Sequence, residues 1–271
     1  MKEGYLERKL EPLGKEEHIP DALKRPLVEV DYEHTNEVDV VLGEGSRKVR
    51  LGATWEPVEV DPSWLEGEKN EQDEELFEGC DPQSWKLLNS FTLELSEYPG
   101  RDLYFFDMDD LPDIIFNPKV KEGHGYGHAF VESNKKEPRV VVFGDIFIPS
   151  GMLAMFHELG HIAFNAKRTT LDPNHFENAV WASENFEELL SHPRIIHPRY
   201  SREIGEIIIE EERVAWAAAI RALRPLIGAG VISKEDVLAM AHQWALQSYS
   251  DDIRKIMGGP VKKLLGRILG E

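Results

Sequence analysis

The 271-residue sequence contains a single cysteine, Cys80, so no disulfide bond can form within the chain. It also lacks an apolar run of the roughly 18 residues that a membrane-spanning helix requires. The first residues are charged throughout and have no apolar stretch typical of a signal peptide. Together these absences predict a cytoplasmic protein that does not contact a membrane.

Acidic residues outnumber basic residues in this sequence. The chain has 31 lysines and arginines against 50 aspartates and glutamates, which gives a formal net charge of −19. A protein that binds the phosphate backbone needs a basic surface, and this composition offers none. We therefore expect no direct contact with nucleic acid and attribute the excess of acid to a solvated surface.

The composition divides the chain into two parts. Residues 1–26 are polar and interrupted by prolines, which predicts an irregular arm. Residues 27–62 contain short runs rich in β-branched residues, a pattern typical of strands. The next stretch, 65–80, carries seven acidic residues and one lysine and predicts a solvated linker. We therefore expect an arm and a small β-rich unit over 1–80 and a main domain over 81–271.

Strands are expected in the first part of the main domain. Residues 81–95 open like a helix, with Asp81 as a possible N-cap and Pro82 at the first position. The strand-like runs that follow are 103–106, 113–116, 128–133 and 139–148. The last is apolar at consecutive positions, which is typical of a central strand. The run 128–133 alternates like an edge strand, and residues 134–138 between the two predict a hairpin turn.

Helices are expected after residue 149. Ser150 is a suitable N-cap for an apolar helix that reaches about residue 167. The further helices are expected at 175–190, at 202–226 after a loop blocked by Pro193 and Pro198, and from 234 onward with Ser233 as the cap.

The pentapeptide HELGH, residues 157–161, lies in the first of these helices. His157 and His161 are four positions apart, so they lie one turn apart on the same helical face. Two imidazoles placed in this way can hold Zn²⁺, and Glu158 can accept a proton from water at the metal. The helix is apolar nearly all round and should be buried, and a metal supplies the partner that buried histidines need.

A catalytic zinc site needs a third protein ligand and a position for water. In the metzincin pattern a histidine six positions after His161 is that ligand, but Lys167 stands there. The candidates lie instead in the long helix near the C-terminus. Glu210 falls on a charged face, whereas Glu211 and Glu212 each fall on an apolar stripe with small residues that let two helices approach. Periodicity alone does not choose between Glu211 and Glu212.

The motif HELGH, followed about fifty residues later by Glu-x-x-Ala-Trp, resembles the Glu-zincin metallopeptidases, most of all their ImmA/IrrE-type branch. In that pattern the third ligand is the glutamate three positions before the alanine, on the helix packed against the HExxH helix. The resemblance therefore implies that Glu212, three positions before Ala215, is the ligand. These relatives commonly carry aspartate or asparagine where Trp216 stands.

The resemblance covers about residues 85–250, because the run of strands into the motif helix is also similar. It implies a zincin-like α+β fold. In such a fold a small mixed or antiparallel sheet packs on the HExxH helix and on a helical C-terminal half. The β-rich N-terminal unit would be an extension, either a module that recruits the substrate or one that inhibits the enzyme.

Glu158 is the expected general base, which takes a proton from water and passes it to the leaving amine. A further donor would stabilise the oxyanion of the transition state. The candidates are Tyr126 and His128 in a glycine-rich stretch, and His197 and Tyr200 on either side of Pro198. An alternative interpretation places a second metal between His124 and His128.

The sequence thus predicts a zinc metallopeptidase acting on a protein or peptide substrate. The resemblance implies a narrow regulatory specificity, since such relatives often cleave repressors or partner proteins. Two alternatives stay open. One is a non-catalytic interaction protein stabilised by zinc, against which the intact Glu158 argues, and the other is a zinc hydrolase that acts on a non-peptide amide.

Overall fold

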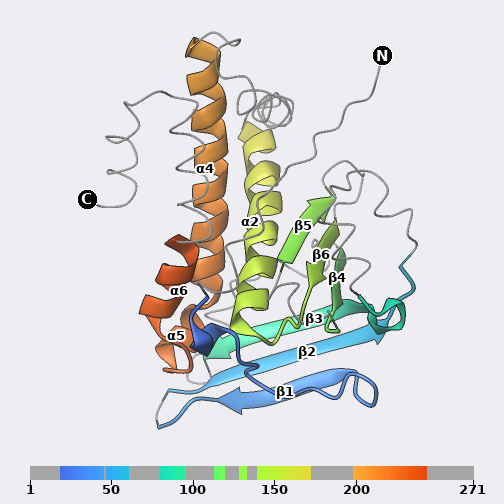
Figure 1. Cartoon of the computed structure of the whole chain (residues 1–271). Coiled ribbons are helices and arrows are strands. Elements are labelled where there is room, and N and C mark those ends of the chain that lie inside the picture. Colours follow the sequence, from blue (N-terminus) through green and yellow to red (C-terminus); the bar gives the residue numbers. More distant parts are fainter. Residues whose placement is uncertain are drawn as a thin grey trace.

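The computed structural model describes residues 19–45, 47–60, 80–95, 113–119, 128–132, 139–171 and 198–242. These residues form one mixed sheet of six strands with two long helices standing on it (Figure 1). The strands precede residue 149 and the α-helices follow it, as the sequence predicts. The protein therefore belongs to the α+β class.

The sheet has the strand order β1-β2-β3-β4-β6-β5. Its strands are β1 (Glu37–Leu42), β2 (Val49–Pro57), β3 (Lys86–Leu95), β4 (Asp113–Asn117), β5 (His128–Glu132) and β6 (Arg139–Phe143). Neighbouring strands are antiparallel except β4 and β6, which run parallel. The prediction that β6 is central and β5 an edge strand is confirmed. Figure 1 shows β4, β6 and β5 rising steeply from the direction of β1–β3, so the sheet curls toward the helices.

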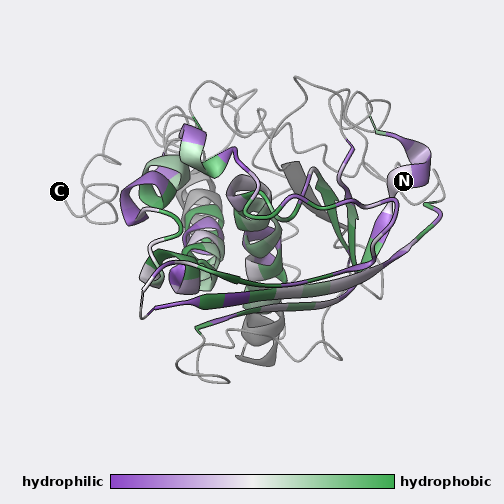
Figure 2. Cartoon of the chain, turned by 90° about the horizontal axis from the view of Figure 1, so that it is seen from below, coloured by the Kyte–Doolittle hydropathy of each residue, from purple (hydrophilic) through white to green (hydrophobic). Residues whose placement is uncertain are grey.

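The helical part consists of α2 (Pro149–Leu171), α4 (Pro198–Ala222), α5 (Arg224–Gly228) and α6 (Lys234–Ala241). Two short 3-10 turns, η2 (Asp21–Leu23) and η4 (Pro82–Ser84), precede β1 and β3. α2 and α4 lie side by side on one face of the sheet, which is also clear when the chain is viewed from below (Figure 2). Buried apolar residues of both helices and of β2, β3, β4 and β6 form one core between them. Within the described parts of the chain, no helix is long and apolar enough to span a membrane.

The helix predicted over residues 81–95 is wrong. Asp81 caps only the single turn η4, and the chain then runs as β3. The pairing of β2 with β3 shifts register so that Asn89 has no residue opposite it. Because of this irregularity the buried Leu88 and Phe91 are three positions apart instead of two. The prediction rested on Asp81 and Pro82, which begin the single turn η4 but do not continue into a helix.

The predicted N-terminal unit is not a separate extension. β1 and β2 are strands of the main sheet, since β2 pairs along its length with β3 from beyond residue 80. Within this unit, residues 27–32 are irregular instead of forming a strand. They pack against the core, and the Leu27 N–H donates to the carbonyl oxygen of Phe147 at 2.9 Å. The expected linker 65–80 lies outside the described residues except for Cys80. The expected strand 103–106, turn 134–138 and helix 175–190 lie outside them entirely.

Two helices begin at prolines, a few residues earlier than the sequence predicts. α2 starts at Pro149, so Ser150 lies inside its first turn and is not the N-cap. α4 starts at Pro198, which was expected to block regular structure. Proline suits the first position of a helix because the N–H it lacks would have no partner there. The cap of α6 is confirmed, because the Ser233 hydroxyl accepts from the Asp236 N–H at 3.0 Å.

A partly buried carboxylate ties the irregular segment to the start of α2. Oδ1 of Asp145 accepts from the Tyr32 hydroxyl at 2.6 Å and from the Phe147 N–H at 2.8 Å. Burial raises the pKa of Asp145, and these two hydrogen bonds only partly offset the effect. The ionised carboxylate therefore costs stability in the folded protein.

Asp145→Asn should accordingly raise the free energy of unfolding at neutral pH, because the amide oxygen can still accept both bonds and no charge is buried. A raised carboxyl pKa leaves the stability unaffected in acid and lowers it as the pH rises through the folded value. The gain should therefore disappear at low pH, which urea unfolding at a series of pH values would measure. Tyr32→Phe is the control and should lose about 1–3 kcal/mol. An Asn variant less stable than wild type at every pH would contradict this account.

Candidate metal centre

Two helices bring the expected metal ligands together. α2 carries His157 and His161 on one face, and α4 presents Glu212 toward them. One ligand atom from each of the three residues lies within 4.8 Å of the other two. All three side chains are buried, with exposed fractions of 6%, 6% and 5%. These residues are 55 positions apart at most along the chain and meet only because α2 packs against α4.

The distances within this group are close to those between the ligand atoms of a small tetrahedral ion. The two Nε2 atoms are 3.0 Å apart. The oxygens of Glu212 lie 3.4 Å from Nε2 of His157 and 3.5 Å from Nε2 of His161. Zinc–ligand bonds of 2.0–2.1 Å in a tetrahedron separate the ligand atoms by roughly 3.3–3.4 Å. The two distances to Glu212 are close to this spacing, and the 3.0 Å between the Nε2 atoms is shorter. Two imidazoles and one carboxylate are also the donor types of catalytic zinc sites, so the residues present fit zinc.

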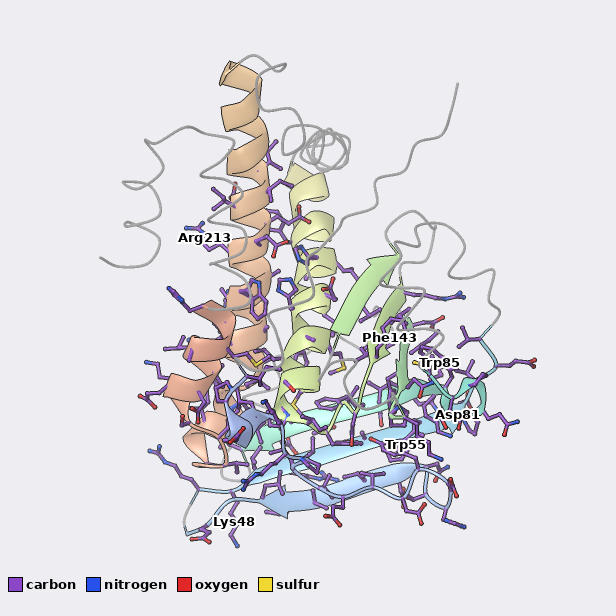
Figure 3. The ribbon with its side chains drawn as sticks, viewed as in Figure 1. Lys48, Trp55, Asp81, Trp85, Phe143 and Arg213 are labelled. Carbon is purple, nitrogen blue, oxygen red and sulfur yellow. The ribbon has the colours of Figure 1, made fainter. Side chains whose placement is uncertain are left out.

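Two further carboxylates surround this group. Oε1 of Glu158 lies 4.0 Å from Nε2 of His157, and Oε1 of Glu211 lies 3.1 Å from Nδ1 of His161. Both are buried, with exposed fractions of 8%. Arg213, the next residue on α4 after Glu212, is exposed and projects away from α2 (Figure 3). The periodicity of the sequence left Glu211 and Glu212 as alternatives. In the structure both are buried, with Glu211 beside Nδ1 of His161 and Glu212 beside Nε2.

The cluster favours positive charge at its centre. Burial alone lowers the pKa of His161, but the carboxylates of Glu212, Glu211 and Glu158 outweigh it and raise the pKa to about 9. A proton or a metal cation can supply the charge that these carboxylates attract.

Gly160, inside the HELGH motif, sets the distance between the two helices. A Cβ atom at this position would lie 2.7 Å from Cα and 2.9 Å from the carbonyl oxygen of Ala215 on α4. Neither backbone atom can move without shifting α4. The absence of a side chain at Gly160 therefore allows the close approach that brings Glu212 to the histidines.

Gly160→Ala should push α4 away from α2 and weaken zinc binding. Alanine is the better helix former by about 1 kcal/mol, but overpacking of a close contact costs about 1–3 kcal/mol. We expect a net loss of unfolding free energy, measured by urea unfolding, together with a raised zinc dissociation constant.

Gly228→Ala is a matched control for this substitution. Among the described residues, its added methyl would meet only the side chain of Leu95, at 3.9 Å, which is an ordinary contact distance. This variant should keep wild-type stability and zinc affinity. If Gly160→Ala behaved in the same way, the close approach would not limit the geometry of the site.

Trp216 covers the ring of the first histidine. Its ring centroid lies 4.3 Å from that of His157, and the two planes are inclined by 37°. Trp216 is 4% exposed, so its indole closes one side of the cluster against water. At this position of α4 an aromatic ring therefore packs against the histidine.

The side chains of the expected oxyanion donors lie outside the part of the chain that the structure describes. The backbone of His128 begins β5, and that of Tyr200 lies in the first turn of α4. Tyr126, His197 and the alternative metal ligand His124 lie outside the described residues. The choice among these residues stays a prediction.

Sequence reasoning missed two features of the site. It treated Glu211 only as a rival ligand and assigned no role to Gly160. The small residues Ala215 and Ala219 did indicate a close helix pair, and a glycine between the two histidines could have been matched to them. No local pattern indicates that Glu211 reaches the other nitrogen of His161.

Comparison with known proteins adds no assignment, since no family model matches the chain and no curated protein or solved structure is significantly similar to it.

Proposed function

We propose that this protein is a zinc-dependent peptidase of the zincin type, related in its site to the ImmA/IrrE-type enzymes. The observation that supports this most directly is the buried group of His157, His161 and Glu212 with Glu158 beside it. Three protein ligands among the described residues is the number found in catalytic zinc sites, which keep one position for water. A zinc ion held there would polarise a carbonyl group and acidify water.

Glu158 would carry out the proton transfers of the reaction. Its carboxylate lies close to His157 and is 8% exposed, so it can reach water beside the ligands while staying shielded from bulk solvent. It would accept a proton from the attacking water and return that proton to the leaving amine. The same two-histidine, one-carboxylate set also serves iron in oxygenases, and the adjacent base favours hydrolysis.

The resemblance to the ImmA/IrrE-type enzymes implies a narrow substrate range, in which the enzyme cleaves a regulatory protein. β5 is an edge strand of the described sheet, and α2 packs against it. An extended peptide that paired with this edge would lie along the helix that carries the histidines.

Metal analysis of the purified full-length chain tests the proposal. We expect about one zinc per chain. Removal of the zinc with a chelator should abolish peptide hydrolysis, and readdition should restore it. Iron in place of zinc, or no tightly bound metal, would reject the proposal.

The substrate can be sought by comparing the proteomes of cells that express wild type and Glu158→Gln. A protein cleaved only in the presence of wild type would identify the target. Hydrolysis of a non-peptide amide, with no cleaved protein, would instead support a different zinc hydrolase.

A further inference from the structure

Each nitrogen of His161 faces a different carboxylate of α4. Nε2 points into the ligand group and lies 3.5 Å from Oε1 of Glu212. Nδ1, on the opposite side of the ring, lies 3.1 Å from Oε1 of Glu211. The imidazole and both carboxylates are buried, with exposed fractions between 5% and 8%. The ring is therefore held from two sides by consecutive residues of one helix.

The contact with Glu211 determines which nitrogen of His161 can bind a metal. A carboxylate accepts a hydrogen bond, so Nδ1 must carry the proton and donate it. A neutral ring has only one N–H, which leaves the lone pair on Nε2, the atom that faces the cluster. The negative charge on Glu211 also makes Nε2 a stronger donor to a cation.

The contact also fixes the direction of the ring. A histidine on a helix can rotate about two side-chain bonds, and a ligand that rotates freely loses entropy when it binds a metal. The bond at Nδ1 removes this freedom before any metal binds. His157 is restrained differently, by the face of the Trp216 indole.

We propose that Glu211 is the positioning residue of this metal centre. Its carboxylate holds His161 in the tautomer and orientation that bind zinc, while Glu212 coordinates the ion. The inference rests on the proposed zinc site but not on the peptidase activity, so binding measurements test it separately.

The test measures zinc affinity of the full-length chain by competition with a chromophoric chelator. Glu211→Ala removes the acceptor and should raise the dissociation constant by about 10–100-fold. Glu211→Gln keeps an acceptor but not the charge, so it should lie between alanine and wild type. The half-buried Glu210, one position earlier on α4, provides the control, and Glu210→Ala should bind zinc like wild type.

A second measurement separates positioning from general loss of structure. Cobalt bound in place of zinc gives a visible absorption spectrum that reports ligand geometry. The spectrum should change in Glu211→Ala and return toward that of wild type in Glu211→Gln. Far-ultraviolet circular dichroism of each variant should show unchanged helix content.

Three results would overturn the inference. They are wild-type zinc affinity in Glu211→Ala, an equal loss of affinity in Glu210→Ala, and absence of zinc binding by the wild type. If the wild type binds zinc and Glu211→Ala weakens it, but no peptide is hydrolysed, the peptidase proposal fails and the role of Glu211 stands.

Discussion

Glu158→Gln is expected to lower peptide hydrolysis by about 10²–10⁴-fold while zinc remains bound. Glutamine has nearly the same shape as glutamate but cannot take a proton from water. Glu158 lies beside the ligand group without belonging to its three members, so the ligands stay in place when its charge is removed. The measurement combines the rate of cleavage of the identified substrate with the zinc content of the variant.

Glu210→Gln provides the comparison, because it removes a carboxylate from α4 outside the ligand group. It should retain wild-type hydrolysis and zinc content. Full activity in Glu158→Gln would remove Glu158 from the role of base. Loss of zinc from this variant would show instead that Glu158 helps to bind the ion.

Glu212→Ala is expected to reduce zinc affinity by on the order of 10³-fold, because it removes one of the three protein ligands. The two histidines alone make a weak site, and the space left by the side chain admits water in place of the carboxylate. Hydrolysis should fall with the zinc content. Competition with a chelator measures the affinity, and added zinc should restore part of the activity.

Comparison with Glu211→Ala tests whether Glu212 or Glu211 is the zinc ligand. Glu211→Ala should weaken zinc binding much less than Glu212→Ala, since one oxygen of Glu212 lies 3.4 Å from Nε2 of His157 and the other lies 3.5 Å from Nε2 of His161. The reverse order of effects would make Glu211 the ligand and Glu212 its support.

Much of the site is already determined by the sequence. The four-residue spacing of His157 and His161 places them on one helical face wherever that helix packs, because the periodicity is a local property. The class of fold, the strands β1, β2 and β4–β6, and the burial of α2 likewise follow from local patterns of apolar residues. Glu212 was selected by resemblance to a family, whereas the periodicity left it equal to Glu211.

Only the tertiary structure decided the rest. Adjacent residues on a helix point about 100° apart, so both Glu211 and Glu212 can face a neighbouring helix, and the way α2 and α4 pack assigns each to its own nitrogen of His161. Asp81 and Pro82 resemble the start of a helix, and the pairing of the following residues with β2 and β4 makes them the strand β3. Long-range pairing and helix packing cannot be derived from local periodicity. They nevertheless determine that the HELGH helix meets Glu212 across the close contact at Gly160.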